Sequence, residues 1–415
     1  MNAEIVAIGD EITSGQLLDT NTQWLSQRLE EMGIRVLYHS TVGDELGPCA
    51  DTFRRAISRA EVVISTGGLG PTADDLTREA VARAVDRPLV ADRKALAHIR
   101  DMFARRNRQM PPRNEQQAMF PKGSRMVENP NGTAPGIDLD VPRPGAGPCR
   151  VFSLPGVPAE MKEMWHGTLA DALRQIGGPR SVVRHRRIKC FGAGESQIEA
   201  MLPDLIRRGR TPRVGINASR NTIILRITAE GTDEQACYAA MEPTIATIRK
   251  CLGDLVFGID EDELQDAVVQ LLAAREKTLA TAEWGTTGLV AQWLDGAADS
   301  QTRYQGGLVA ASDANLMNLL DVDLKLLAAQ SPASPTVVEA MAAGCRRRFG
   351  SDYALAVGSF PQFDPAAAEP KPVFIALADS RGVRVKGYPY AGHPALLKVL
   401  CAKRALNMAR LALMG

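Results

Sequence analysis

A glycine-rich turn at residues 66–71 is the part of the sequence whose chemistry best suits an anionic ligand. It follows the apolar stretch 61–65, and two acids and the expected start of a helix come directly after it; the residues concerned are Gly67, Gly68, Gly70, Asp74 and Asp75. Glycine N–H groups approach a phosphate closely, and the positive end of a helix dipole adds to the attraction. The carboxylates of Asp74 and Asp75 would repel a bare phosphate, so the pattern predicts a divalent cation between acid and ligand.

The same residues also admit a purely structural interpretation. Asp75 could cap the helix while the glycines form only a tight turn. The G-G-x-G spacing matches neither the dinucleotide-binding pattern G-x-G-x-x-G nor the P-loop. The spacing alone leaves both interpretations open.

The elements around the turn alternate between strands and helices. Apolar stretches at 5–8, 34–38 and 61–65 predict strands, and the spacing of Leu25, Leu29 and Met32 predicts a helix between the first two. This order favours a parallel sheet with helices on both faces. Residues 107–148 are rich in Pro, Gly, Asn and Arg, and we expect a long irregular stretch there.

Beyond residue 150 the chain again alternates strands and helices. A strand is expected at 150–154, followed by a helix with Pro158 in its first turn. A smaller unit follows with expected strands at 186–191 and 222–229 and helices at 195–206 and 233–249. The last unit has a strand-turn-helix at 277–293 and a long helix from about Pro394.

Composition excludes several classes of protein. Among the 415 residues, 49 Lys and Arg face 48 Asp and Glu, so the net charge is +1 and a nucleic-acid partner is not expected. The start of the chain lacks a secretory pattern and no apolar stretch reaches the ~18–20 residues of a spanning helix, so we expect a cytoplasmic protein without a membrane partner. Seven scattered cysteines and five histidines argue against a zinc site, and no haem or flavin is expected.

Several motifs together resemble the CinA family (competence/damage-inducible protein CinA). They are Ala7-Ile8-Gly9-Asp10-Glu11-Ile12, Asp19-Thr20-Asn21, the turn from Thr66 to Asp75, and Leu154-Pro155-Gly156-Val157-Pro158-x-Glu160-Met161. The resemblance implies three α/β or α+β domains. These are a MogA/MoaB-like molybdopterin-binding domain with a parallel sheet at 1–175, a small α+β KH-like domain at 181–256 and an α/β CinA C-terminal domain at 260–415.

The resemblance also implies chemistry for the first domain, which in some members is a metal-dependent ADP-ribose pyrophosphatase. Asp44 and Asp75 match the two acids of the pocket, where they would hold a Mg, Mn or Co ion that bridges the diphosphate and activates a water. The remaining ligand-binding residues implied are Thr66, Gly67, Gly68, Gly70, Asp74, Gly156 and a second loop with Asn131 and Gly132. The alternative for Asp44 is a turn residue beside Gly43.

The C-terminal domain resembles a nicotinamide mononucleotide deamidase whose motifs have degenerated. The family turn Ala-Glu-Ser-Cys-Thr-Gly-Gly is here Ala282-Glu283-Trp284-Gly285-Thr286-Thr287-Gly288. Of a second family motif, Tyr-Ser-Asn-x-x-Lys, this chain keeps only the serine, Ser312. A third family motif, Gly-Ile-Ala-Gly-Pro, is here Gly358-Ser359-Phe360-Pro361-Gln362. Amide hydrolysis needs an activated nucleophile and a stabilised oxyanion. We therefore expect the deamidase activity to be lost and Trp284 to fill the vacated pocket.

The function expected from the sequence is hydrolysis of ADP-ribose or a related nucleotide diphosphate. The alternatives are a non-catalytic, competence-associated scaffold and a pterin- or nucleotide-binding protein. A homodimer is expected. RNA binding by the middle domain is not, because it lacks a clear Gly-x-x-Gly clamp.

Overall fold

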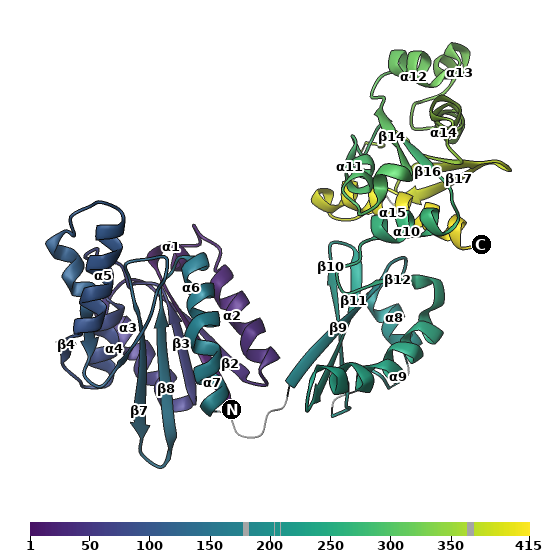
Figure 1. Cartoon of the computed structure of the whole chain (residues 1–415). Coiled ribbons are helices and arrows are strands. Elements are labelled where there is room, and N and C mark those ends of the chain that lie inside the picture. Colours follow the sequence, from purple (N-terminus) through teal and green to yellow (C-terminus); the bar gives the residue numbers. More distant parts are fainter. Residues whose placement is uncertain (177–181, 203, 208, 363–368) are drawn as a thin grey trace. The chain divides into compact units, whose positions relative to one another are not determined.

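A computed structural model of the chain describes residues 1–176, 182–202, 204–207, 209–362 and 369–415 (Figure 1). It forms two compact units. One comprises Met1–Arg184 with Glu230–Cys237, and the other comprises His185–Ala229 with Tyr238–Gly415. The expected start of the middle domain at residue 181 lies outside the described residues.

The N-terminal unit contains a six-stranded sheet in the order β2-β1-β3-β8-β7-β6. Its strands are β1 (Asn2–Ile8), β2 (Arg35–Val42), β3 (Val62–Thr66), β6 (Arg125–Val127), β7 (Gly136–Arg143) and β8 (Ala146–Leu154). The pairs formed among β2, β1, β3 and β8 are parallel, as the alternating order predicts, whereas β7 and β6 are antiparallel. The expected parallel sheet is thus extended by an antiparallel edge.

Helices cover both faces of this sheet, as expected. Because side chains alternate along a strand, Ile5 of β1 packs into one core and Val6 into the other. The core with Val6 contains residues of α3 (Leu46–Arg59), α4 (Thr77–Ala84) and α5 (Arg93–Arg105). The core with Ile5 contains residues of α2 (Thr20–Glu31), α6 (Pro158–Met164) and α7 (Ala170–Ile176), and a short helix α1 (Asp10–Thr13) follows β1.

The expectation of an irregular stretch at residues 107–148 is wrong. The segment contains a 3-10 helix (Pro112–Ala118) and the strands β5 (Met119–Pro121), β6 and β7, and β5 pairs with β4 (Leu89–Ala91). The interior of β7 includes a charged residue, Asp138, which is only 4% exposed. Arg125 and Arg150 each donate two hydrogen bonds of 2.8–2.9 Å to its carboxylate, and this pairing makes burial of the acid possible.

The middle region forms a four-stranded sheet in the order β10-β11-β9-β12. Its elements are β9 (Val182–Cys190), α8 (Glu195–Met201), β10 (Arg213–Ser219), β11 (Thr222–Gly231), α9 (Glu234–Leu252) and β12 (Val256–Ile259). The two expected strands and both helices are present, but β10 and β12 were not predicted. A two-residue turn of Arg220 and Asn221, both with positive φ, joins β10 to β11.

The C-terminal region forms a five-stranded sheet in the order β14-β13-β15-β16-β17. Its strands are β13 (Leu279–Glu283), β14 (Tyr304–Val309), β15 (Tyr353–Val357), β16 (Pro372–Asp379) and β17 (Gly382–Pro389). Its helices are α10 (Leu264–Ala274), α11 (Leu289–Asp295), α12 (Asp313–Leu320), α13 (Leu324–Ala329), α14 (Pro335–Phe349) and α15 (Pro394–Met414). The expected strand-turn-helix is formed by β13 and α11, and the expected last helix is α15.

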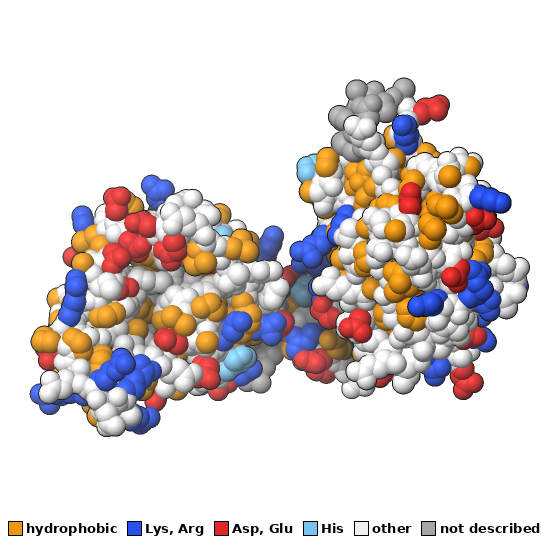
Figure 2. Space-filling view, turned by 90° about the horizontal axis from the view of Figure 1, so that it is seen from above, with side chains coloured by type: hydrophobic (Ala, Val, Ile, Leu, Met, Phe, Trp, Pro, Cys, Tyr) orange, Lys and Arg blue, Asp and Glu red, His pale blue; other side chains and the backbone are white. Residues whose placement is uncertain are grey.

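The surface agrees with the balanced composition. On the face shown in Figure 2, Lys and Arg side chains are interspersed with Asp and Glu side chains. Within the described residues, no helix combines the length and the apolar character that crossing a membrane would need.

Candidate functional site

A cleft of about 610 Å³ lies where β1, β3 and β8 end, and it collects most of the residues singled out in the sequence. Ligands of open α/β sheets bind in this position, outside the carboxyl ends of the strands. Eight of the ten predicted site residues line the cleft: Asp44, Thr66, Gly67, Gly68, Gly70, Asp74, Asp75 and Gly156. Asn131 and Gly132 are not part of its lining, although their neighbours Thr133 and Ala134 are.

The carbonyl groups of residues 67–70, the central part of the glycine-rich turn, are all bound on the protein side. The hydroxyl of Thr77 donates to the Gly67 carbonyl (2.8 Å), and the Thr77 N–H donates to the Gly68 carbonyl (3.1 Å). The Arg78 guanidinium donates to the carbonyls of Leu69 (2.6 Å) and Gly70 (3.4 Å). The four successive carbonyls are therefore held by the first two residues of α4.

Two N–H groups of the same turn have no acceptor in the described part of the chain. The N–H of Gly67 donates to Leu154 (3.0 Å) and that of Gly70 to Asp75 (2.7 Å). Among the residues that the structure describes, nothing accepts from the N–H groups of Gly68 and Leu69. Successive free N–H groups in a turn that contains a left-handed residue form a concave anion-binding site.

Glycine is required at two positions of the turn. Gly67 has a φ of 109°, and a Cβ there would lie 2.1 Å from the Ile8 carbonyl oxygen. Gly68 has a φ of 62°, and a Cβ there would lie 2.4 Å from the Thr77 hydroxyl. Any larger residue would push the turn away from β1 or from α4 and so change the shape of the cleft.

Arg78 supports the turn from the interior. It is 1% exposed, and burial lowers the pKa of its guanidinium to about 10, against the opposing effect of the Glu79 and Asp75 carboxylates. The residue therefore stays charged at neutral pH. Gln117 also donates to the Leu69 carbonyl, at 3.3 Å, so that this carbonyl has two donors.

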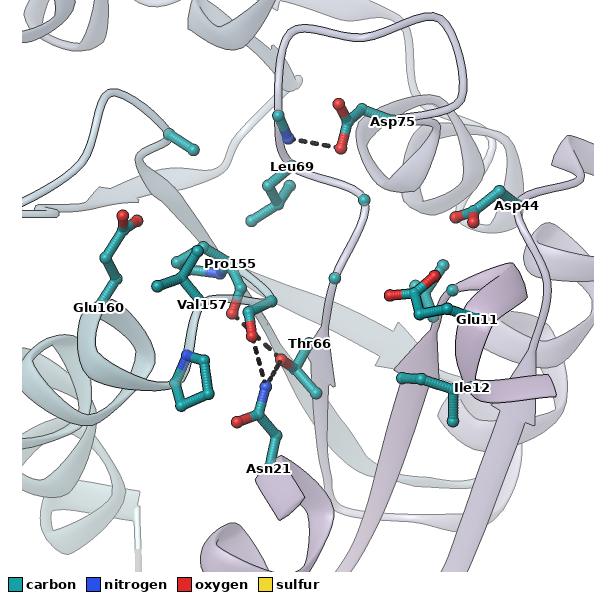
Figure 3. A pocket seen from close by; sticks show the side chains of 18 of the residues that line it. Glu11, Ile12, Asn21, Asp44, Thr66, Leu69, Asp75, Pro155, Val157 and Glu160 are labelled. Atoms are coloured by element: carbon teal, nitrogen blue, oxygen red, sulfur yellow. Dashed lines mark hydrogen bonds between the residues drawn. The ribbon is translucent and has the colours of Figure 1, made fainter. Parts of the chain in front are cut away.

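Asp75 holds the turn closed. Its Oδ1 accepts from the Gly70 N–H, and its Oδ2 accepts from the Thr72 N–H (2.8 Å) and from the Thr72 hydroxyl. The dashed line at Asp75 in Figure 3 marks one of these hydrogen bonds. The helix α4 begins at Thr77 without a side-chain cap, so Asp75 caps the turn and not the helix.

Asp44 lies among other acids. Its Oδ2 accepts from the Asp10 N–H (2.9 Å), and its own N–H donates to Asp10 Oδ1 (3.0 Å). Burial, together with the negative charges of Asp10, Glu11 and Asp74, raises the pKa of Asp44 even though the Asp10 N–H opposes the shift. Figure 3 shows Asp44 and Glu11 on the same side of the cleft, from different segments of the chain.

These acids fit a divalent cation of the magnesium type. The described residues contain no group of three or more His, Cys, Asp or Glu side chains arranged to hold a metal by themselves. Magnesium, however, is commonly held by one or two carboxylates together with the phosphates of a ligand. Asp44 and Glu11 supply such a pair, whereas both oxygens of Asp75 are already engaged in the turn.

The floor of the cleft is a network that joins three segments. The Asn21 side chain of α2 donates to the Thr66 hydroxyl (3.0 Å) and to the Gly156 carbonyl (2.8 Å). The Thr66 hydroxyl in turn donates to the Pro155 carbonyl (3.1 Å), as drawn in Figure 3. Asn21 thus fixes the end of β3 against the end of β8.

The loop with Asn131 and Gly132 is held by its own neighbours. The N–H groups of both residues donate to Asn129 Oδ1, and the Asn129 amide donates to Glu160 Oε2 (2.7 Å). A Cβ on Gly132 would lie 2.2 Å from the same Glu160 atom. The main-chain donors of this loop are therefore used internally.

The sequence assigned no role to Arg78, Glu11, Asn21 or Glu160. Glu11, Asn21 and Glu160 stand inside the motifs at 7–12, 19–21 and 154–161, so position in a motif was an available signal. Arg78 offered none, since an arginine in the first turn of an amphipathic helix is usually exposed.

The degenerate deamidase motif, in which Trp284 is expected to fill the vacated pocket, lies at the turn between β13 and α11. The ring of Phe360 occupies the space beside Gly285, because a Cβ on Gly285 would lie 2.2 Å from Phe360 Cδ1. The ring of Phe360 also packs against the ring of Tyr390, with 4.9 Å between their centroids and an angle of 37° between their planes. The turn itself is fixed to the end of β15, since the Trp284 N–H donates to Val357 and the Gly285 N–H to Gly358.

Comparison with known families divides the chain into three regions. Residues 4–175 match the family described as "Probable molybdopterin binding domain", residues 185–258 match "Damage-inducible protein CinA KH domain", and residues 261–413 match "CinA C-terminal domain". The three matches follow one another along almost the whole chain.

Individual proteins are also similar to this chain. A "Putative competence-damage inducible protein" of Symbiobacterium thermophilum is 38% identical over 375 residues, which are 90% of this chain and 87% of the relative. A "CinA-like protein" of Frankia casuarinae is 36% identical over 427 residues, covering 100% of this chain and 97% of the relative. Among solved structures, the protein CinA of Thermoplasma acidophilum, described as of unknown function, is 34% identical with a TM-score of 0.37. That similarity covers 41% of this chain and 96% of the other.

The role of Arg78 predicts a loss of stability on its removal. Arg78→Met leaves two carbonyls of the turn without their charged donor, so we expect the free energy of unfolding of the N-terminal unit to fall by about 3 kcal/mol. Chemical denaturation followed by the fluorescence of Trp24 and Trp165 measures it. Arg83→Met, an exposed substitution on the same helix, should change it by less than about 0.5 kcal/mol. Equal effects of both variants would contradict the role of Arg78.

The contact of Gly285 with Phe360 predicts coupling between the two positions. Gly285→Ala should destabilise the C-terminal unit by about 1–3 kcal/mol, because the new methyl group overlaps the ring. In a Phe360→Ala background the same substitution should have almost no effect, and a double-mutant cycle measures the difference. Gly215→Ala, where a Cβ meets nothing within 4 Å, is the control. Additive effects would show that the ring does not occupy this space.

Proposed function

The chain belongs to the CinA family, and on that basis we propose that its N-terminal domain binds a nucleotide diphosphate such as ADP-ribose with a divalent cation and hydrolyses the diphosphate. The observation that carries the proposal is the pair of free N–H groups at Gly68 and Leu69, in the same cleft as the carboxylates of Asp44 and Glu11. Donors and acids in one cleft suit a phosphate ligand that arrives with its own cation.

The roles of the residues follow from their positions. The N–H groups of Gly68 and Leu69 would bind oxygens of one phosphate and orient the diphosphate in the cleft. Asp44 and Glu11 would hold the divalent ion, with Asp10 positioning Asp44 through their reciprocal hydrogen bonds. When bound, such an ion neutralises charge on the diphosphate and lowers the pKa of a coordinated water. Asp75 acts indirectly, by keeping the turn in the shape that exposes its donors.

The apolar part of the cleft supports a nucleotide over a small inorganic anion. Leu17, Leu18 and Val157 line the cleft and are 56%, 80% and 52% exposed, respectively. Large apolar side chains at this level of exposure are suited to contact with a ligand ring. The cleft volume of about 610 Å³ lies within the range typical of small-molecule sites.

A pterin ligand is the second candidate, because a flat ring that carries a phosphate meets the same requirements. The match of residues 4–175 to the molybdopterin-binding family favours it. The two candidates differ in outcome: a pterin-binding protein would bind ADP-ribose poorly and release no product from it.

We assign no deamidase activity to the C-terminal domain. In the deamidase motif that this chain resembles, a Ser and a Cys stand where Trp284 and Gly285 are found, and an Ala stands at Phe360. The space left by the smaller Gly285 is taken by the larger Phe360. The two replacements offset one another in volume, so the domain keeps a packed structure without the nucleophile.

The proposal predicts metal-dependent cleavage of ADP-ribose to AMP and ribose 5-phosphate. Asp44→Asn should lower the rate with Mg²⁺, Mn²⁺ or Co²⁺ by about 100-fold or more, because it removes a carboxylate from the cation site. Asp75→Ala should abolish turnover by opening the turn. Product analysis by chromatography measures both effects. Asp51→Asn, at an exposed acid of α3, should leave the rate unchanged. Undiminished turnover by Asp44→Asn would remove that residue from the site.

The second prediction concerns nicotinamide mononucleotide. The full chain should release no ammonia from it above the background of the buffer, because the turn after β13 offers no activated nucleophile. A coupled ammonia assay tests this, with a deamidase of the same family as positive control. Sustained release that scales with the concentration of this protein would contradict the assignment.

A further inference from the structure

The C-terminal unit contains a second cavity, of about 480 Å³, which no role described above uses. It lies between the β10–β11 turn, the end of β9, the start of α10 and one side of α15, which lie side by side in Figure 1. Its charged lining residues are Lys189, Arg220, Glu263 and Lys403. Apolar side chains, including Ile224 and Val399, and the half-buried Trp293 form the rest of the wall.

Lys403 is a buried ammonium group with too few acceptors. It is 7% exposed, and its Nζ donates to the Thr222 hydroxyl at 2.6 Å, the one acceptor that the described part of the chain gives it. An ammonium carries three N–H donors, so two remain without a partner. Burial lowers the pKa of Lys403, the nearby Lys189 and Arg220 add to the shift, and Glu263 opposes it.

The single acid of the cavity cannot balance its cations. Glu263 pairs with Lys189 at 2.7 Å and also accepts an N–H at the start of α10, where its side chain forms a capping box. Lys189 is itself only 5% exposed. Three cations therefore face one carboxylate, and the carboxylate is already engaged. A buried positive charge without a counter-ion is unfavourable, and an anion placed in the cavity would relieve it.

Arg220 adds a cation at the mouth of the cavity. It is exposed, and the described residues offer its guanidinium no ion-pair partner. It lies in the two-residue turn between β10 and β11, where its φ is 46°, and this turn fixes the position of its Cα. Guanidinium and ammonium groups that converge from different elements are the usual donors to phosphate.

We propose that this cavity binds the phosphate group of a small phosphorylated ligand, with Lys403 and Lys189 at its inner end and Arg220 at its mouth. The apolar wall and Trp293 then lie beside the part of the ligand that carries the phosphate. The N-terminal cleft contains main-chain donors and carboxylates, whereas this cavity contains the positively charged side chains themselves. Phosphate binding in the cavity therefore needs no divalent metal.

The test measures binding of inorganic phosphate and of AMP to the full chain by calorimetry, in EDTA and at constant ionic strength set with chloride. Both probes should bind saturably, and AMP should bind more tightly than phosphate because the apolar wall contacts the rest of the molecule. Lys403→Met and Arg220→Asn should each weaken binding about tenfold or more. Arg220→Asn changes only an exposed side chain and keeps a residue that tolerates positive φ, so its folding is not in question.

The control is Lys398→Met, which removes an exposed lysine from the same helix outside the cavity and should leave binding unchanged. Melting curves give a second readout: phosphate should raise the melting temperature of the wild type but not that of Lys403→Met. The proposal would be overturned if neither probe bound saturably, or if Lys398→Met weakened binding as much as the cavity variants do. It would also be overturned if binding were lost in Asp75→Ala and kept in the cavity variants, because the anion would then bind in the N-terminal cleft.

Discussion

The binding of four successive carbonyls by the start of α4 is the constraint on which the N-terminal site depends. A main-chain turn exposes either its N–H or its C=O groups to a cleft, and here Thr77 and Arg78 draw the carbonyls of residues 67–70 toward the protein. The donors of Gly68 and Leu69 are thereby left for a ligand. Arg78 has to be buried to do this, and its desolvation is offset by charge-assisted hydrogen bonds to main-chain oxygens.

The acids of the site have different roles. Both carboxylate oxygens of Asp75 accept hydrogen bonds from the turn, whereas one oxygen of Asp44 accepts from the Asp10 N–H and the carboxylate lies among further negative charges. Repulsion among these carboxylates favours the binding of a cation, because a divalent ion relieves several unfavourable interactions at once. At the turn after β13, by contrast, the ring of Phe360 fills the space beside Gly285.

Much of this arrangement could be predicted from the sequence, because it rests on local patterns. Apolar stretches and helical periodicity gave the parallel strands and the helices on both faces, and the glycine turn indicated the ligand-binding edge of the sheet. The composition of residues 107–148 led to the wrong prediction of an irregular stretch. Apolar and polar residues alternate around Asp138, which is typical of a strand, but the burial of this acid is explained only by its pairing with Arg125 and Arg150. The role of Arg78 could not be predicted, because an arginine in the first turn of an amphipathic helix is usually exposed. The clustering of Lys189 with Lys403 could not be predicted either, because it depends on contacts between elements far apart in the chain.

The central claim is that a diphosphate binds to the free N–H groups of the turn, and nuclear magnetic resonance of the main-chain amides tests it directly. The protein would be labelled with ¹⁵N at glycine and leucine and titrated with a methylene-bridged, non-hydrolysable analogue of ADP-ribose in the presence of Mg²⁺. The account predicts that the amide signals of Gly68 and Leu69 shift more than those of other labelled residues, and that they return when EDTA is added. Unchanged signals at these two residues under saturating ligand would contradict it.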